Sequence, residues 1–463
     1  MSLIKSISGI RGTIGGRPGD GLSPLDIVKF ASAYGIWIKQ TYGSQKPRIV
    51  IGRDARLSGE MVNNIVCGTL VGLGIDVIDV GLSTTPTVEI AVTDLNTDGG
   101  IILTASHNPK QWNALKLLNN KGEFISDIEG KFILELAEKE DFNYADVNDL
   151  GVYSQRHDLI NLHIQKVLAL PYVDVDAIRQ ANFKVVVDAV NSTGGFVIPQ
   201  LLESLGVQTI HKLHCDASGH FAHNPEPLPE HLRDLSQEVV KTNADLGISV
   251  DPDVDRLALV CEDGEMFGEE YTLVAVADAV LQYHKGGNTV SNLSSTRALR
   301  DVTEKMGGSY SASAVGEVNV VNMMKETNAI IGGEGNGGVI LPEIHYGRDA
   351  LVGVAIFLTH LAKYGKTTSM LRQSYPNYFI SKNKIELTPQ IDVDKVLESI
   401  HAKYKNQPVN TIDGVKIEFD KEWVHLRKSN TEPIIRIYSE SQSLSTADTL
   451  AKKIIEDIKE IIK

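Results

Sequence analysis

The chain has 463 residues, which is enough for three or four domains of ordinary size. Its net charge of −14 argues against a nucleic-acid partner, because phosphate backbones are bound by clustered lysines and arginines. Since the first residues lack the apolar core of a signal peptide and no stretch reaches the ~18 apolar residues of a membrane span, we expect a cytoplasmic globular protein with no membrane partner.

One pattern of strand, polar loop, helix and second strand occurs three times along the chain, at 48–80, 184–210 and 289–307. Each helix is expected to end at a glycine, namely Gly74, Gly206 or Gly307, because glycine tolerates the left-handed backbone of a helix cap. The recurrence predicts three related, mostly parallel αβα domains. Chance likeness remains an alternative, since all doubly wound folds share this pattern. The three cysteines lie near apolar segments and are expected to be core thiols rather than metal ligands or disulfide partners.

The last part of the chain has short segments of alternating apolar and polar residues in place of the earlier apolar α/β pattern. Residues 375–385 are expected to form a linker, Asp413-Gly414 a hairpin turn, and 446–463 an amphipathic helix, which together predict a small α+β domain. The predicted fold is therefore α/β, with three similar αβα doubly wound domains and a C-terminal α+β domain. The expected bounds are 1–150, 151–256, 257–372 and 373–463.

A serine loop, residues 104–109, follows the apolar strand predicted at 101–103. Ligands of α/β sheets bind at strand ends, so the hydroxyl of Ser106, beside the imidazole of His107, could carry a phosphoryl or acyl group. Lys110 and Lys116 follow it. The same residues would also make an ordinary serine-rich turn.

An aspartate loop, residues 251–256, follows the apolar strand predicted at 246–250. Asp251, Asp253 and Asp255 alternate there, so their oxygens can converge on one hard cation such as Mg²⁺. An EF-hand is excluded, because its sixth position requires glycine and Arg256 occupies it here. A solvated acidic turn is the less favoured interpretation, since three clustered unpaired charges between apolar runs are costly.

A glycine loop, residues 332–338, is expected after a strand at 329–331. Its glycines would let the backbone approach a ligand closely, leaving Glu334 and Asn336 to reach sugar hydroxyls. A flexible surface turn is equally compatible with this composition. The spacing matches neither a Rossmann fingerprint nor a Walker loop.

An arginine loop, residues 427–433, lies between two predicted strands of the last domain. Its guanidinium, hydroxyls, amide and loop N–H groups could cradle a phosphate dianion. A capped polar turn is the alternative. Two further turns, one with Arg11 and one with Arg53, Asp54 and Arg56, are expected to be structural, since Arg–Asp pairs often hold a loop in place.

Taken together and in this order, the four loops resemble those of the α-D-phosphohexomutase superfamily, and the resemblance runs essentially end to end. It implies four domains around a central cleft, an isomerase (intramolecular phosphotransferase) activity, and a serine carried as phosphoserine, here Ser106. Mg²⁺ would be held by that phosphate with Asp251, Asp253 and Asp255. A phosphosugar would be the small-molecule partner, a sugar 1,6-bisphosphate the intermediate and activator, and a monomer or homodimer the assembly.

The resemblance also assigns roles to the remaining candidate residues. Arg11, Arg256 and Lys116 would neutralise charge around Ser106 during phosphoryl transfer, with His107 and Lys116 as candidates for proton transfer. Glu334 and Asn336 would bind the sugar ring. The non-reacting phosphate would be held by Arg427, Ser429, Asn430 and Thr431.

Three departures from the family pattern surround the expected sugar position. Asn336 and Gly338 stand where the usual loop, Gly-Glu-x-Ser-Gly-His, has Ser and His; Ala114 replaces a glycine; and Glu317 follows Val315-Gly316. An acidic residue around the sugar favours a substrate that carries an amino group. We therefore expect a phosphoglucosamine mutase, and phosphoglucomutase/phosphomannomutase activity is the alternative. A non-catalytic phosphosugar-binding relative and a simple phosphatase are alternatives of other classes.

Overall fold

The computed structural model describes all residues except 1, 7–8, 45, 389–390, 429–433 and 463. The chain divides into two compact units, each built from two stretches of sequence. The first unit comprises Met1–Ala279 and Asn336–Leu371, and the second comprises Val280–Gly335 and Arg372–Lys463. Within the described residues, no helix combines the length and apolar character needed to cross a bilayer.

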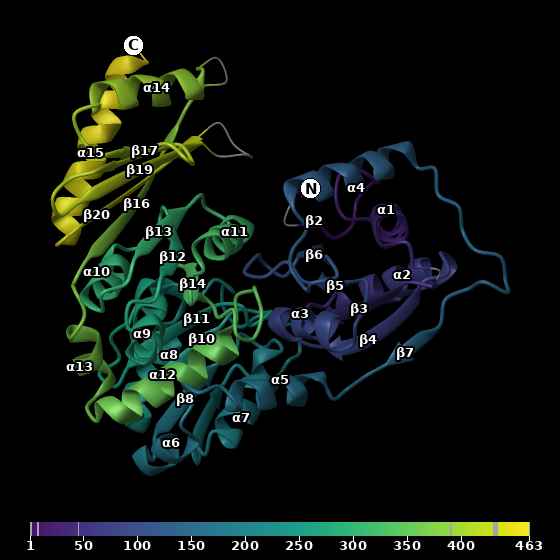
Figure 1. The fold of residues 1–463 in the computed structure, drawn as a ribbon, viewed down its shortest axis with the longest axis horizontal. Coiled ribbons are helices and arrows are strands. Elements are labelled where there is room, and N and C mark those ends of the chain that lie inside the picture. The colour runs from purple at the N-terminus through teal and green to yellow at the C-terminus, as the bar shows by residue number, and fades with distance from the viewer. Residues whose placement is uncertain (1, 7–8, 45, 389–390, 429–433, 463) are drawn as a thin grey trace. The chain divides into compact units, whose positions relative to one another are not determined.

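The first sheet of the first unit has seven strands, of which the four neighbours β5, β3, β4 and the edge strand β7 are parallel (Figure 1). Across the sheet the order is β1 (Leu3–Ser6), β2 (Gly9–Thr13), β6 (Trp112–Leu118), β5 (Gly99–Leu103), β3 (Arg48–Arg53), β4 (Asp76–Leu82) and β7 (Tyr153–Gln155). The alternation of apolar side chains along β3 sends Ile49 and Ile51 to one face and Val50 to the other. Both faces of the sheet are therefore buried.

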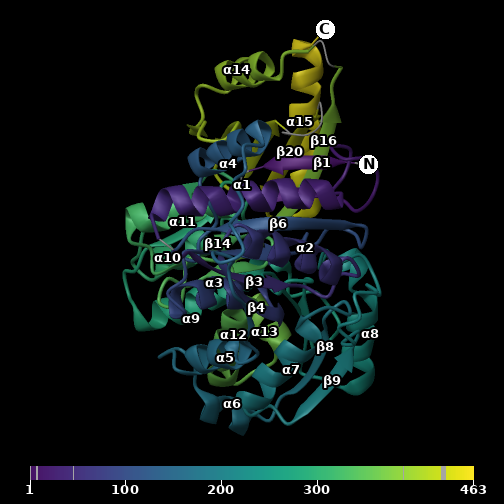
Figure 2. The same cartoon turned by 90° about the vertical axis from the view of Figure 1, so that its right-hand side faces the viewer.

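Helices cover both faces of this sheet, which makes it the middle of three layers. One face packs against α1 (Pro24–Tyr42), α2 (Gly59–Gly72) and α4 (Asp127–Lys139). The other packs against α3 (Thr85–Asp94) and α5 (Leu159–Leu168). Figure 2 shows α1 lengthwise beside β6.

The second sheet of the first unit has four strands in the order β11 (Leu257–Cys261), β10 (Leu246–Val250), β8 (Lys184–Asp188) and β9 (Thr209–Leu213). It packs against α7 (Gly194–Ser204), α8 (Arg233–Thr242) and α12 (Ala350–Tyr364). The other short elements assigned to this part of the chain are α6 (Val175–Ala181), η1 (Pro229–His231), β15 (Gly338–Ile340) and α13 (Thr368–Gln373), the last of which ends across the unit boundary.

The second unit contains a parallel sheet and an antiparallel one. In the parallel sheet β12 (Thr289–Asn292) pairs with β13 (Tyr310–Ser313) and β14 (Ile331–Glu334), with α10 (Ala298–Lys305) and α11 (Glu317–Thr327) packed against it. The antiparallel sheet runs β16 (Phe379–Glu386), β20 (Ile434–Ser441), β19 (Trp423–Lys428), β18 (Val415–Glu418) and β17 (Val409–Asn410), and α14 (Val393–Lys403) and α15 (Leu444–Ile461) bury its apolar face. Helix α9 (Glu269–Tyr283) crosses from the first unit into the second.

The expected helix-closing glycines are confirmed. Gly74, Gly206 and Gly307 have φ values of 77°, 88° and 77°, in the left-handed region that favours glycine. All three cysteines are free, and Cys67 and Cys261 are buried as expected. Cys215 is only partly buried.

Three expected loop boundaries are wrong. Most of the expected linker at 375–385 is strand, because β16 begins at Phe379 and runs to Glu386. β14 extends through Glu334, so the first part of the glycine loop is strand rather than turn. β19 extends through Lys428, so Arg427 lies on a strand, where it pairs with Arg436 of β20. The serine loop and the aspartate loop do follow the carboxyl ends of β5 and β10, as predicted.

Candidate active site

Ser106 lies on a tight turn directly after β5. Its φ of 48° is in the left-handed region, which a residue with a side chain adopts only when surrounding contacts hold it there. The Ser106 N–H donates to Thr104 Oγ1 at 2.9 Å. The Ser106 hydroxyl donates to Asp251 Oδ2 at 2.6 Å, so the serine and aspartate loops meet within the first unit.

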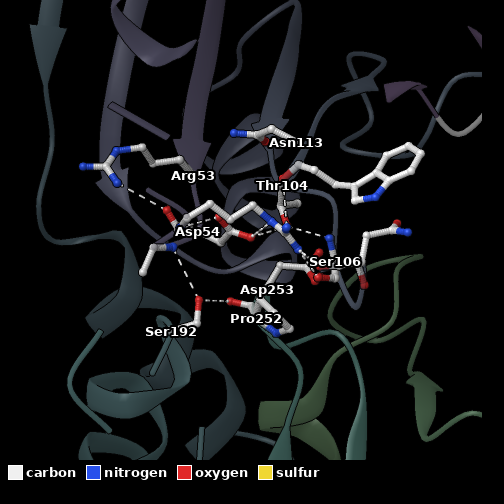
Figure 3. A network of polar contacts seen from close by, with 12 residues as sticks. Arg53, Asp54, Thr104, Ser106, Asn113, Ser192, Pro252 and Asp253 are labelled. Atoms are coloured by element: carbon white, nitrogen blue, oxygen red, sulfur yellow. Dashed lines mark hydrogen bonds and ion pairs between the residues drawn. The ribbon is translucent and has the colours of Figure 1, made fainter. Parts of the chain in front are cut away.

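Arg56 holds the serine loop through hydrogen bonds to backbone carbonyls. Its guanidinium donates to the carbonyl oxygens of Ser106, Asn108, Pro109 and Trp112, the last three at 2.9, 3.0 and 2.9 Å. Figure 3 shows the surrounding network, in which Thr104 also donates to Asp54 at 2.6 Å. Asp54 in turn accepts from Arg56 Nε at 2.9 Å. The structural role expected for this Arg–Asp pair is confirmed.

The aspartate loop is held by its own backbone and by a neighbouring loop. Asp251 Oδ1 accepts the N–H groups of Asp255 and Arg256, each at 3.1 Å. The hydroxyls of Ser192 and Thr193 donate to the Pro252 carbonyl at 2.7 and 2.9 Å, and Figure 3 shows the first of these bonds. The turn that presents the three aspartates is therefore rigid.

Asp251, Asp253 and Asp255 are fully buried and converge. One ligand atom from each lies within 4.8 Å of the other two, and among the described residues these three form the one such group. Asp253 Oδ2 accepts from Thr85 at 2.5 Å and from Lys116 at 2.7 Å, and Asp255 Oδ2 accepts from Arg348 at 2.7 Å.

In two of these carboxylates the second oxygen receives no hydrogen bond from a described residue. Asp253 Oδ1 and Asp255 Oδ1 are buried and accept no hydrogen bond from any described residue. An unpaired buried carboxylate oxygen is costly unless something binds it. A hard divalent cation with oxygen ligands, such as Mg²⁺, fits this donor set.

The charges of the site perturb one another. Burial lowers the pKa of Lys116, but the carboxylates of Asp253 and Asp255 outweigh burial and raise it. Burial and the neighbouring Asp255 and Asp253 raise the pKa of Asp251. Burial opposes ionisation of Asp253, but the ion pair with Lys116 dominates and lowers its pKa. Strongly perturbed carboxylates in one cluster are typical of functional sites.

Three further candidates surround Ser106. His107 Nδ1 lies 3.5 Å from Ser106 Oγ, and burial together with Arg256 and Arg11 lowers the pKa of His107 to about 2. Arg11, on β2, donates to Asn108 Oδ1 at 2.7 Å. Arg256 Nε lies 3.9 Å from Asp255 Oδ1. The structure thus brings together all the residues expected to act at the serine.

The residues expected to bind the sugar and the second phosphate belong to both units. Glu334 belongs to the second unit and accepts from Asn292 at 2.8 Å, whereas Asn336 belongs to the first unit and accepts the Gly338 N–H at 3.2 Å. Arg427 forms an ion pair with Asp413 at 2.7 Å in the second unit. Ser429, Asn430 and Thr431 lie outside the described residues.

Sequence reasoning missed Thr85 and Arg348. Both contact the aspartates from positions far away in the chain, so no local motif points to them. Thr85 does follow Thr84, the N-cap of α3 and a helix-start signal, but that signal says nothing of what the helix end faces. For Arg348, the indirect sign in the sequence is Gly338, because a side chain there would collide with that of Arg348.

Comparison with known proteins identifies the family. Models of the phosphoglucomutase/phosphomannomutase alpha/beta/alpha domains I, II and III match residues 3–144, 161–264 and 268–378, and the model of the C-terminal domain matches residues 385–457. The chain belongs to the α-D-phosphohexomutase superfamily. The predicted fold class, of three αβα domains and a distinct C-terminal domain, is confirmed.

Full-length relatives of this phosphohexomutase carry different substrate names. The chain is 36% identical over 98% of its length to a Thermococcus kodakarensis phosphoglucomutase/phosphomannomutase, 99% of which is covered. It is 31% identical over 98% of its length to a Sulfurisphaera tokodaii phosphoglucosamine/phosphogalactosamine mutase, 100% of which is covered. A crystal structure of a Burkholderia thailandensis phosphoglucomutase/phosphomannomutase family protein superposes with a TM-score of 0.85 at 26% identity, covering 98% of each chain. The chain is therefore an enzyme of the isomerase class that transfers phosphoryl groups.

Proposed function

We propose that this phosphohexomutase interconverts hexose 1-phosphates and 6-phosphates, with Ser106 as the phosphoryl carrier and a sugar 1,6-bisphosphate as the intermediate. The observation that carries the proposal is the 2.6 Å contact between the Ser106 hydroxyl and Asp251, one of three converging buried carboxylates. The four domains with bounds near 150, 256 and 373 belong to the same proposal.

Each half-reaction moves one phosphoryl group between Ser106 Oγ and a sugar oxygen. The sugar hydroxyl attacks phosphorus, the P–Oγ bond breaks as the new P–O bond forms, and the hydroxyl proton leaves. His107, whose Nδ1 lies 3.5 Å from Ser106 Oγ, is the candidate to take that proton. Lys116, an ammonium that donates to Asp253 at 2.7 Å, is the candidate to give a proton to Oγ as the P–Oγ bond breaks. Reversal with the other phosphate of the bisphosphate restores the phosphoserine.

The chain's own cations supply most of the charge neutralisation that phosphoryl transfer needs. Arg11, Arg256 and Lys116 surround the serine. Asp251, Asp253 and Asp255 would hold Mg²⁺, which supplies Lewis-acid stabilisation of the phosphoryl oxygens when bound. Glu334 and Asn336 are proposed to bind the sugar. The arginine loop, with Arg427, Ser429, Asn430 and Thr431, is proposed to anchor the non-reacting phosphate in both orientations, so one site serves both half-reactions.

Phosphoglucosamine is the proposed substrate. Glu317 supplies the acidic group behind this choice, because a carboxylate near the sugar favours an ammonium on it. The named relatives include a phosphoglucosamine/phosphogalactosamine mutase and a phosphoglucomutase/phosphomannomutase, so the second activity is the alternative to test.

The test compares the wild type, S106A and the control S399A on the 1-phosphates of glucosamine, N-acetylglucosamine, mannose and glucose, with Mg²⁺ and the matching 1,6-bisphosphate. Ser399 is exposed on α14, so S399A measures the effect on turnover of removing a serine hydroxyl that lies outside the proposed site. S106A is expected to lose turnover of every sugar, because no oxygen remains to carry the phosphoryl group. Turnover by S106A near the wild-type rate would refute the proposal.

The same assay separates the alternatives. Wild-type turnover is expected to be highest with glucosamine 1-phosphate. Free phosphate released in place of product would indicate a phosphatase. Sugar-phosphate binding without any turnover would indicate a non-catalytic relative.

A further inference from the structure

The segment just before α12 contacts the aspartate loop from a remote part of the sequence. Asp349 caps α12 by accepting the N–H groups of Leu351 and Val352 at 2.8 and 3.2 Å. The next residue, Ala350, donates its N–H to the Val254 carbonyl at 3.2 Å. The start of α12 is thereby fixed against the turn that presents the three aspartates.

Arg348, the residue before this cap, reaches into the site. Its Nη2 donates to Asp255 Oδ2 at 2.7 Å, and the side chain is buried, with 8% of the residue exposed. The other cation near this oxygen, Lys116, lies 3.6 Å away and gives its shorter contact, 2.7 Å, to Asp253. Arg348 is therefore the principal partner of Asp255 Oδ2.

Gly338 makes room for this arginine. A Cβ placed on Gly338 would lie 2.3 Å from Arg348 Cδ and 3.0 Å from Arg348 Cγ. The backbone of Gly338 does not lie in the left-handed region, so another residue could adopt its conformation. What the glycine provides here is space for the Arg348 side chain.

We propose that Arg348, admitted by Gly338, is a positioning residue that holds Asp255 in the orientation needed to bind a divalent cation. A carboxylate can turn about its terminal torsion, and an anchored Oδ2 leaves Oδ1 as the oxygen offered to the cation. Asp255 Oδ1 is the buried oxygen that accepts no hydrogen bond from the described residues. This inference rests on the proposed function, because it concerns the cation site assigned there.

The first experiment measures Mn²⁺ binding to the full chain by electron paramagnetic resonance, without sugar. R348M keeps the apolar stem but removes the guanidinium, and it is expected to weaken Mn²⁺ binding by about tenfold or more, as loss of a partner behind a metal ligand does. R348K keeps one charged donor and is expected to bind Mn²⁺ more tightly than R348M. Unchanged or tighter binding by R348M, or no advantage of R348K, would overturn the proposal.

The second experiment uses the glycine. G338A is expected to weaken Mn²⁺ binding by displacing Arg348, but to add less than about twofold when Arg348 is already methionine, since the displaced group is then absent. Independent, multiplicative losses in the double variant would overturn the coupling. G68A is the matched control, because a Cβ on Gly68 meets nothing within 4 Å. R156M, at an exposed ion pair, controls for the loss of an arginine.

Turnover then distinguishes positioning from general damage. R348M is expected to lower kcat with an almost unchanged KM for the sugar phosphate, because the defect lies at the cation. G338A is judged by Mn²⁺ binding alone, because its Cβ would also lie 3.1 Å from Oδ1 of Asn336, a proposed sugar ligand. Circular dichroism checks that each variant is folded, and G338A carries the test alone if R348M does not fold. Absence of Mn²⁺ binding by the wild type would refute the proposed cation site itself, whereas equal binding by wild type and variants refutes only the role of Arg348.

Discussion

At the scale of single residues, Arg56 stands out because its whole guanidinium is used by the protein itself. It is 2% exposed and donates to four backbone carbonyls of residues 106–112 and to Asp54. A buried arginine with every donor satisfied acts as a scaffold rather than as a ligand group. The left-handed backbone of Ser106 depends on it.

R56M is expected to destabilise the fold and to slow turnover. The substitution leaves the Asp54 carboxylate buried without its cation, which costs about 3–5 kcal/mol. Burial already raises the pKa of Asp54, although Arg56 counteracts this. A serine displaced by about 1 Å would cost on the order of 100-fold in kcat. Urea unfolding and turnover measure the two effects, with R179M at an exposed helix position as the control. An unchanged free energy of unfolding would contradict this assignment.

Local chemistry made part of the site predictable. Ser106 and the three aspartates were each predicted at a strand end from the local sequence, whereas their proximity to one another followed only from the family resemblance. The role of Arg348 could not be inferred, because this residue adjoins none of the four motif loops in the sequence. Its place follows from a contact across 93 positions, with Gly338 as the indirect sign.

At the scale of elements, three helices of the first unit are joined by a buried chain of carboxylates and imidazoles. Glu89 on α3 contacts His345 Nδ1 at 3.0 Å, and His345 Nε2 lies 3.1 Å from Asp349, the cap of α12. His163 on α5 completes the chain, with Nε2 2.8 Å from Asp349 and Nδ1 2.9 Å from Thr87. Because α3 bears Thr85, which donates to Asp253, and α12 begins at Ala350, which donates to the Val254 carbonyl, the chain ties together two helices that contact the aspartate loop.

H345Q is expected to lower the free energy of unfolding, most strongly near neutral and acidic pH. Burial lowers the pKa of His345, but its hydrogen bond to the Asp349 carboxylate and its ion pair with Glu89 outweigh burial and raise the pKa to about 10. A raised histidine pKa stabilises the fold fully below the unfolded value of about 6.5 and progressively less up to the folded value. The wild-type advantage over H345Q should therefore shrink from about pH 6.5 to pH 10.

Guanidinium unfolding at several pH values measures this difference. H401Q, on the exposed side of α14, is the matched control and should show no such trend. An advantage that stays constant between pH 6 and 10 would mean that His345 is not a charged partner of the two carboxylates.

The strand–helix units expected from apolar runs and helix-ending glycines are present, and the errors at their boundaries have physical causes. The glycines of 332–338 were interpreted as a loop, yet β14 runs through Glu334. A Cβ on Gly332 would lie 2.5 Å from Met324 Sδ, so this glycine lets α11 pack closely on the strand. Close packing and turning both select glycine, and the sequence does not distinguish them.

At the scale of the whole molecule, the described residues that are proposed to hold the cation all lie in the first unit. Serine, aspartates, Lys116 and Arg348 all belong to Met1–Ala279 or Asn336–Leu371. The assignment of 336–371 to that unit was not predictable, because contacts such as Arg348–Asp255 and Ala350–Val254 decide it. The number and kind of domains, by contrast, followed from the repeated pattern and the family resemblance.

Mg²⁺ is expected to stabilise the folded protein by mass action, since the unfolded chain has no site. At about 100 times the dissociation constant, the gain is about 2.7 kcal/mol. D253N is expected to lose this gain because the unpaired Oδ1 of Asp253 is one of the offered ligands. Calorimetry with and without Mg²⁺ measures the shift, with D176N at an exposed helix position as the control. An equal Mg²⁺ effect in D253N would place cation binding elsewhere.

The first unit is built from two separate stretches of sequence, so the ribosome completes it only after it has made part of the second unit. A ribosome delivers the aspartate loop long before Arg348, and it must first make residues 280–335, which fold into the other unit. During that interval Asp255 Oδ2 lacks Arg348, and the Val254 carbonyl lacks the N–H of Ala350. A nascent chain stalled before residue 336 therefore carries the complete serine loop but only part of the proposed cation site, so the capacity to bind Mn²⁺ should arise only late in translation.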